Sequence, residues 1–379
     1  MRRAIPISTI TILSFIALSC SIRKYQERYD RLYKRYNSVE VTTLLKDSLL
    51  NVRALEIDEN GYFGFATSNG EIGGKDLDWR GGKSYSLSEE RQLEVEGDLI
   101  ESASISIQLK HDSIIPNFRS LAVTKDAGFV MSIGSPALLY RINNDSISVV
   151  YKEGHPKVFY DSMEFWNDRE GIAIGDPTDG CMSIIITRDG GANWNKLSCN
   201  SLPAANEGEA AFAASDTNIA IVGDAVWIAT GGKSSRILYS PDKGISWEIR
   251  ETPIVQGKET TGIYSIDFYN AERGFAIGGD YLNPDENSAN KMLTLDGGKT
   301  WAIIGAGQSP GYRCCVQFIP NNNGRELVAV GFKGIDYSPD FGATWTHMSD
   351  ESFYTIRFLN DSTAYAAGKG RISKLTFIE

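Results

Sequence analysis

Histidine, cysteine and basic charge are scarce in this sequence, and each shortage excludes a class of function. The 379 residues include three His and five Cys with no CxxC or HExxH pattern, which leaves few ligands for zinc or haem. Lys and Arg number 38 against 48 Asp and Glu, so the net charge is −10 and no broad basic surface is available for nucleic acid. We therefore expect no metal, no cofactor and no nucleic acid among its ligands.

A dinucleotide-binding fingerprint is also missing. The nearest match, from Gly305 to Gly311, has one residue too many and carries Pro310 where a helix should begin. The chain has instead 37 Gly with 17 Tyr, 16 Phe and 7 Trp, which indicates many short strands and tight turns. Closed β architectures of this length can form a single domain.

The first twenty residues have the organisation of an export signal. A basic start precedes an apolar run from about Ile7 to Leu18, which is too short to span a bilayer. Cys20 follows a small residue and resembles the bacterial lipoprotein box, although Ala17 stands where such boxes usually carry Leu. We expect residues 1–20 to be a lipoprotein-type signal peptide with Cys20 lipidated. The alternative is a plain cleaved signal or an uncleaved anchor.

Residues 21–37 are predicted to be a basic tether. Six basic residues stand against two acidic ones between Ser21 and Tyr36, which favours an anionic membrane surface next to a lipid anchor. Tyr residues recur there at helical spacing, so the segment is either a short amphipathic helix or a solvated tether. The expected location is a bacterial envelope membrane, with the protein facing the periplasm rather than the cell surface.

An eight-residue pattern, S/T-x-D-x-G-x-[S/T/N]-W, occurs four times and is the strongest signal in the sequence. In this pattern, known as the Asp box, the carboxylate and hydroxyl groups hydrogen-bond turn amides and Gly supplies a positive φ. The Trp packs the hairpin onto its neighbour. We therefore predict structural roles for Asp189, Trp194, Asp242, Trp247, Asp296, Trp301, Asp340 and Trp345.

The same order of strands surrounds each box and defines seven units. A strand opens the unit, a small-residue strand ending in Gly follows, and two further strands flank the box. Radial repeats of this kind are β-propeller blades. Successive units are separated by 40 to 65 residues and open near Arg53, Phe118, Val158, Gly208, Gly262, Gly311 and Ser352.

The last unit supplies three strands before the chain ends, and an unfilled blade would expose a sheet edge. Apolar and polar residues alternate over residues 38–43 as in a strand, and these residues belong to no other unit. We therefore assign them as the fourth strand of the last unit. The fold class is thus all-β: a single seven-bladed propeller of four-stranded antiparallel blades over residues 38–379. The residues between Gly74 and Asn117 are expected to hold the outer half of the first blade and an insertion.

Asp boxes in a propeller are shared by sialidases, xyloglucan-type glycosidases, sortilin-like receptors and the photosystem II stability and assembly factor family. The segments Gly171–Gly180 and Gly208–Ser215 are similar to non-photosynthetic bacterial lipoproteins of that last family, also described as BNR-repeat proteins. The resemblance covers roughly residues 50–379. In phototrophs it implies an assembly factor that holds a membrane-protein intermediate.

A binding site is predicted at the rim away from the boxes. Because the boxes occupy third turns, the opposite rim collects the second turns and the starts of the innermost strands. Acids on one arc facing basic residues on the other would form a concave polar site. The alternative is that these groups form salt bridges that seal the channel. The rim residues are Arg53, Arg119, His155, Asp176, Asp179, Glu209, Asp280, Tyr281 and Arg313.

These features favour a non-catalytic, monomeric scaffold that binds an envelope protein or a small polar or glycan ligand, with no catalytic residue assigned. The alternative is a glycoside hydrolase, sialidase-like or xyloglucanase-like, with two rim carboxylates across the glycosidic bond. Asp176 or Asp179 with Glu209 or Asp280 would supply them. No convincing Tyr-Glu nucleophile pair of the sialidase type appears in the sequence.

The remaining cysteines raise the question of a disulfide, because an exported chain meets an oxidising compartment. Cys181 enters the first box hairpin and Cys199 leaves it, with their midpoint at the turn. This places them opposite each other or one position apart, within reach of a bond. The alternative is two packed thiols. Cys314 and Cys315 are adjacent, point to opposite faces of a strand and are expected to stay free.

Overall fold

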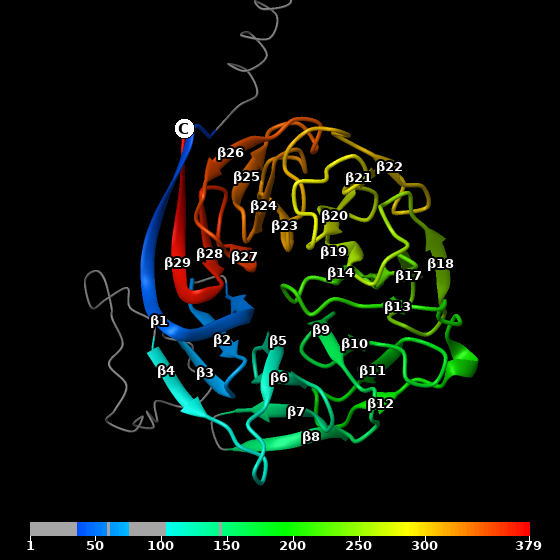
Figure 1. Ribbon diagram of the computed structural model, residues 1–379. Helices are drawn as coiled ribbons and strands as arrows, with labels where there is room; N and C mark the ends of the chain where they lie inside the picture. Colours follow the sequence, from blue (N-terminus) through cyan, green and yellow to red (C-terminus); the bar gives the residue numbers. More distant parts are fainter. Residues whose placement is uncertain (1–35, 59–60, 76–103, 144–145) are drawn as a thin grey trace, which may run out of the picture.

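The computed structural model describes residues 36–58, 61–75, 104–143 and 146–379. The predicted signal peptide with Cys20, and the predicted tether as far as residue 35, lie outside these residues. The described chain forms 29 β-strands and one 3₁₀ helix, Cys199–Ser201. Its antiparallel sheets surround a common centre (Figure 1), so the protein is all-β as predicted. No helix among the described residues is long and apolar enough to cross a membrane.

Four of the sheets have four strands each. In each sheet the first strand lies nearest the centre of the ring and the last strand lies at its periphery (Figure 1). Their strands are β5 (Asn117–Thr124), β6 (Ala127–Ile133), β7 (Ala137–Ile142) and β8 (Ile147–Glu153); β9 (Tyr160–Phe165), β10 (Gly171–Gly175), β11 (Ser183–Thr187) and β12 (Asn195–Lys196); β14 (Ile219–Val222), β15 (Ala225–Ala229), β17 (Arg236–Ser240) and β18 (Glu248–Glu251); and β23 (Cys315–Phe318), β24 (Leu327–Gly331), β25 (Gly334–Ser338) and β26 (Thr346–Ser349).

A six-stranded sheet contains a fifth set of four consecutive strands, extended on its inner side by two short strands. The short strands pair Glu209 with Gly232 and connect the sheet to the preceding unit. Its strands, in spatial order, are β13 (Glu209–Ala210), β16 (Gly231–Gly232), β19 (Thr261–Phe268), β20 (Gly274–Asp280), β21 (Lys291–Thr294) and β22 (Ala302–Ile303).

The seven-stranded sheet joins the two ends of the described chain through one long strand, β1 (Ser38–Ile57). Its first half pairs with the C-terminal strand, from Ser38 opposite Ile378 onward, and its second half pairs with β2. The predicted strand at residues 38–43 thus lies beside the C-terminal strand, and it continues into the inner strand of the first unit. The other strands are β2 (Phe63–Thr67), β3 (Glu71–Lys75), β4 (Ser104–Gln108), β27 (Thr355–Phe358), β28 (Thr363–Ala367) and β29 (Lys369–Ile378).

Apolar side chains fill the space between neighbouring sheets. Between the β5–β8 and β9–β12 sheets, Phe129, Met163 and Trp194 belong to one buried cluster, and the Trp194 ring meets Phe165 edge-on at 5.7 Å. Burial of each such side chain stabilises the fold by about 1.5–3 kcal/mol. This packing directs the innermost strands to the centre, where all of them start at one face of the ring and end at the other.

The four repeated turn segments form one pattern of hydrogen bonds. In the second, Ser240 Oγ accepts from Gly244 N at 2.8 Å and Asp242 Oδ1 accepts from Ser246 N at 2.8 Å. The other three segments have the equivalent bonds. Gly244 has φ +82°, and a Cβ there would lie 2.6 Å from Ile186. Hydroxyl, carboxylate and glycine thus have the turn-forming roles that the sequence predicts.

Candidate functional site

A cavity of about 700 Å³ opens at the face where the innermost strands start. We call it the arginine pocket. Four of the nine predicted rim residues line it: Arg53, Arg119, Asp176 and Tyr281. The rest of the lining is mostly apolar and aromatic: Phe159, Ala210, Ala211, Phe212, Ala213, Ala214, Tyr264, Tyr312, Cys314, Phe332 and Tyr354.

Two guanidinium groups supply the positive charge of the arginine pocket. Arg53 Nη1 donates to Ala214 O at 2.7 Å, and its guanidinium carbon lies 3.8 Å from the centre of the Tyr354 ring. Arg119 Nη1 donates to Ala213 O at 3.2 Å. Burial, and then the nearby charge of Arg53, lower the pKa of Arg119 to about 10, so the Arg119 guanidinium stays charged at neutral pH. The acceptors named here are neutral carbonyls, which leave the positive charge available to an anionic ligand.

Asp176 is the pocket's titrating acid. It follows β10, and its Oδ1 accepts from Ala211 N at 2.9 Å. Burial raises the pKa of Asp176 to about 6. Behind the lining, Asp161 on β9 is fully buried, and burial followed by the charge of Asp176 raises its pKa well above the usual carboxyl value. The acid facing the pocket is therefore neutral below pH 6 and negative above it.

Aromatic side chains form much of the lining of the arginine pocket, and two of them are partly exposed. Phe212 stacks on Tyr264 with ring centres 4.0 Å apart, and Tyr312 lies 5.3 Å from Phe332. Tyr281 and Phe332 are 43% and 41% exposed. The sequence reasoning missed Tyr264, Tyr312 and Tyr354, yet each lies within two residues of a predicted unit opening. The same topological rule could have found them.

Two further rim residues form buried ion pairs instead of lining the pocket. Glu209 Oε2 lies 2.5 Å from Nη2 of Arg236, and Arg313 Nη2 lies 2.5 Å from Asp336 Oδ2. All four side chains are at most 9% exposed. For these two residues the structure has the salt bridges of the alternative interpretation, because each charge is compensated by a buried partner.

The other three rim residues lie outside the lining, Asp280 at the end of β20 and His155 and Asp179 in loops. Asp280 accepts from Asn283 Nδ2 at 2.8 Å and pairs with Lys258 at 3.3 Å. His155 Nδ1 accepts from the Lys157 amide at 3.1 Å, which fixes a local turn. Asp179 is exposed next to the disulfide hairpin. Of the four carboxylates considered for a glycosidase pair, Asp176 lines the arginine pocket and the others do not.

The structure does contain a Tyr-Glu contact that the sequence reasoning did not detect. Glu153 Oε2 accepts from the hydroxyls of Tyr151 and Tyr160, each at 2.8 Å, and Oε1 accepts from Lys196. Burial raises the pKa of both tyrosines. None of these four residues lines the arginine pocket, and their bonds connect β8, β9 and β12.

Residues 210–217, which we call the central segment, extend into the middle of the ring between β13 and β14 (Figure 1). Ala210 to Ala214 contribute to the arginine pocket, and Asp216 and Thr217 contribute to a second cavity of about 410 Å³. This second cavity, the Arg357 chamber, lies where the innermost strands end. The central segment therefore separates the two cavities and forms the floor of each.

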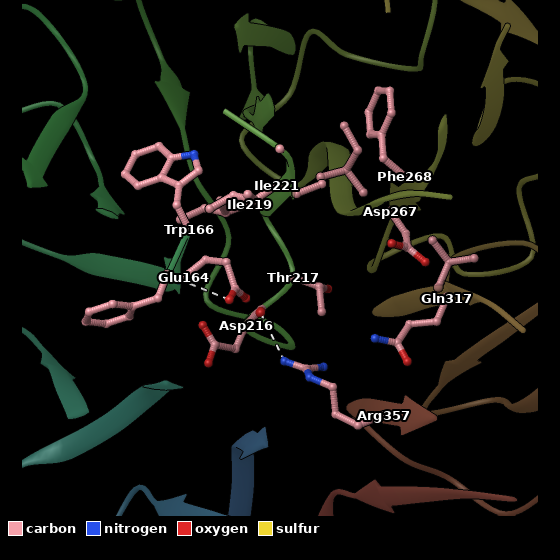
Figure 2. Close-up of a pocket in the computed structure, with 15 residues that line it drawn as sticks. Glu164, Trp166, Asp216, Thr217, Ile219, Ile221, Asp267, Phe268, Gln317 and Arg357 are labelled. Atoms are coloured by element: carbon pink, nitrogen blue, oxygen red, sulfur yellow. Dashed lines mark hydrogen bonds between the residues drawn. The ribbon is translucent and has the colours of Figure 1, made fainter. Parts of the chain in front are cut away.

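The Arg357 chamber combines carboxylates with apolar side chains (Figure 2). Arg357 Nε donates to Glu56 Oε1 at 2.8 Å, and Arg357 Nη2 donates to the backbone oxygen of Asp216 at 3.2 Å. Burial raises the pKa of Asp267 to about 6, and burial with repulsion from Glu56 raises that of Glu164 to about 7. No group of three or more metal-ligating side chains is arranged to hold an ion in the described part of the chain.

Cys181 and Cys199 form a disulfide with Cα atoms 5.5 Å apart, which is the pair that the hairpin spacing predicts. Strand β11 pairs Ile185 with Lys196, a register that places the two cysteines one position apart. Cys314 and Cys315 are buried free thiols.

No family model matches this chain, and no curated protein sequence matches it. Solved structures do. YCF48 bound to D1 peptide is 13% identical with a TM-score of 0.60, over 91% of this chain and 96% of that one. YCF48 from Cyanidioschyzon merolae is 11% identical with a TM-score of 0.55, over 90% and 99%. A streptogramin B lyase is 13% identical with a TM-score of 0.59, over 91% and 99%. At these identities the matches establish a β-propeller fold and no function.

Proposed function

We propose that the protein is a non-catalytic scaffold that captures a segment of another envelope protein in the arginine pocket. A carboxylate of the captured segment would bind Arg53 and Arg119, and an adjacent aromatic or apolar group would pack on the tyrosines. The observation that carries this proposal is the pairing of two charged guanidinium groups with an aromatic wall in one cavity of about 700 Å³. Arg and Tyr are the residue types that dominate binding energy at protein interfaces.

Exposed apolar residues around the mouth support a protein partner rather than a small free solute. Tyr281, Leu282 and Phe332 are 43%, 67% and 41% exposed, and the rings of Tyr281 and Phe332 both lie near Tyr312. Exposed apolar side chains beside a cavity are typical of interaction surfaces. The structure of YCF48 with a bound D1 peptide adds a fold-level analogy, since that propeller also binds a segment of another protein.

The placement of the carboxylates is the reason for preferring binding over glycoside hydrolysis. That chemistry needs two carboxyl groups on either side of the scissile bond. In the arginine pocket Asp176 lines the cavity, and Asp161 lies fully buried behind the lining. We therefore propose binding without catalysis for this protein.

The finer architecture and location belong to the same proposal. Four four-stranded sheets, the β19–β22 set and the two halves of the seven-stranded sheet support a ring of seven blades. Pairing of Ser38–Lys46 with β29 supports closure of the ring by the N-terminal strand. The bonding of the four turn segments supports their assignment as Asp boxes. The sequence around Cys20 supports a lipid anchor in a bacterial envelope membrane, with the propeller facing the periplasm.

Calorimetric titration with N-acetylphenylalanine tests the pocket, because this probe carries one carboxylate and one aromatic ring. We expect it to bind at least tenfold more tightly than its neutral amide. The Arg53→Gln and Arg119→Gln variants should lose that difference, whereas Arg169→Gln, a change at an exposed loop residue, should keep it. Equal affinity for acid and amide, or no binding of either, would overturn the proposal.

A further inference from the structure

The central segment contacts the innermost part of every neighbouring unit. Arg53 and Arg119, from the first two units, donate to its carbonyls. The Ile266 amide of β19 donates to Thr217 O at 2.9 Å. On the remaining side, Ser215 Oγ donates to Cys314 O at 2.7 Å and Thr355 Oγ1 donates to Ser215 O at 2.9 Å. The segment is therefore held from all sides of the channel and cannot move without breaking bonds to several sheets.

Asp216 anchors this segment at its far end. Its carboxylate accepts from the backbone amides of Leu121 at 2.8 Å and Met163 at 3.2 Å, which belong to two different sheets. Its own φ is +60°, a left-handed conformation that few residues other than glycine adopt. The side chain is 4% exposed and lines the Arg357 chamber rather than the arginine pocket. A strained backbone held by a buried carboxylate is typical of a position whose geometry serves a neighbouring site.

Asp216 is one of the residues that hold the part of the central segment carrying the two carbonyls of the arginine pocket. Ala213 and Ala214 come three and two residues before it, and their oxygens receive the bonds from Arg119 and Arg53. The two guanidinium groups repel each other, and this repulsion, after burial, contributes to the lowered pKa of Arg119. Fixed carbonyl acceptors offset this repulsion and orient both groups, so loss of the anchor would let the carbonyls move and the guanidinium groups separate.

We propose that Asp216 is a positioning residue of the arginine pocket, although it lies across the channel in the Arg357 chamber. Its carboxylate fixes the central segment, and the segment fixes the two guanidinium groups at the spacing that a ligand carboxylate needs. The central segment also closes the inner end of the pocket. The pocket therefore accepts a side chain or chain end that enters from the mouth, and it excludes a segment threaded through the ring. This inference deepens the proposed function and rests on it for the identity of the ligand.

The test compares Asp216→Gly with Asp112→Gly. Both substitutions remove an aspartate at positive φ, and Asp112, with φ +51°, lies in an exposed loop. The first readout needs no ligand: the rates at which phenylglyoxal modifies Arg53 and Arg119, followed by mass spectrometry with exposed Arg169 as the internal reference. We expect both rates to change at least fivefold in Asp216→Gly and to stay unchanged in Asp112→Gly.

The second readout is the affinity for N-acetylphenylalanine, which should fall at least tenfold in Asp216→Gly. If that variant does not fold, Asp216→Asn decides, because it tolerates the same φ and keeps one acceptor oxygen. We expect it to give smaller changes in the same direction. A folded Asp216 variant with wild-type modification rates overturns the inference. Failure of the wild-type protein to bind the probe would count against the proposed function instead, since the modification rates are measured without it.

Discussion

Removing the Cys181–Cys199 disulfide should lower the stability of the propeller by a predictable amount. The bond closes a loop between cysteines separated by 18 positions. In the chain-entropy account, cross-linking a loop of that length stabilises the fold by about 3 kcal/mol. The bond joins Cys181, just before β11, to the 3₁₀ helix after β12, so its loss frees the outer edge of one sheet.

The free energy converts to a melting temperature through the unfolding entropy. A cooperative unit of about 340 residues has an unfolding entropy of about 0.7 kcal/mol/K, so about 3 kcal/mol corresponds to about 4–5 °C. Thermal melts followed by circular dichroism should therefore place the Cys181→Ser, Cys199→Ser double variant about 4–5 °C below the wild type.

Thermal melts repeated in the presence of a reducing agent provide the internal control. The reducing agent should lower the melting temperature of the wild type to that of the double variant. It should leave the melting temperature of the variant unchanged, because Cys314 and Cys315 are free thiols. With Cys20 blocked by the proposed lipid, thiol titration of the unfolded, unreduced protein should find two reactive thiols. Identical melting of wild type and variant in the absence of reductant would refute the entropic reasoning, and four thiols would refute the bond.

Three further perturbations follow from the site and the turns. The affinity for N-acetylphenylalanine should fall as the pH rises from 5 to 7, because Asp176, with a pKa of about 6, becomes a carboxylate that repels the ligand; titrations of Asp176→Asn should show a flat profile. In urea unfolding, Asp242→Ala should cost about 1–2 kcal/mol through its lost turn bonds, and the exposed Asp224→Ala should cost much less. Glu209→Gln should cost about 3–5 kcal/mol by leaving its buried arginine partner uncompensated, whereas Glu207→Gln on the surface should be neutral; equal costs would contradict the ion-pair argument.

Part of the candidate site follows from topology alone. Strand order and the position of the turn segments place Arg53, Arg119 and Asp176 at one mouth of the ring, and the structure has all three in one cavity. The charges at Glu209 and Arg313 are predicted at the same rim, but each forms a buried ion pair. Glu209 of β13 pairs with Arg236 of β17 in another sheet, and Arg313, just before β23, pairs with Asp336 of β25. Arg236 and Asp336 carry no sequence signal that marks them as those partners.

The sequence by itself determined the local structure of this protein. Hydroxyl, aspartate and glycine at fixed spacing encode each turn locally, because the side-chain bonds of the hydroxyl and the aspartate lie within eight residues. The alternation of apolar and polar residues over residues 38–43 likewise indicates a strand that needs a partner. Only the tertiary structure decided the course of the central segment. Its bonds run from Asp216 to Leu121 and Met163, across 95 and 53 positions, and from Arg53 to Ala214, across 161. Contacts of that kind depend on which sheets meet at the centre of the ring, and no local pattern of residues encodes that meeting.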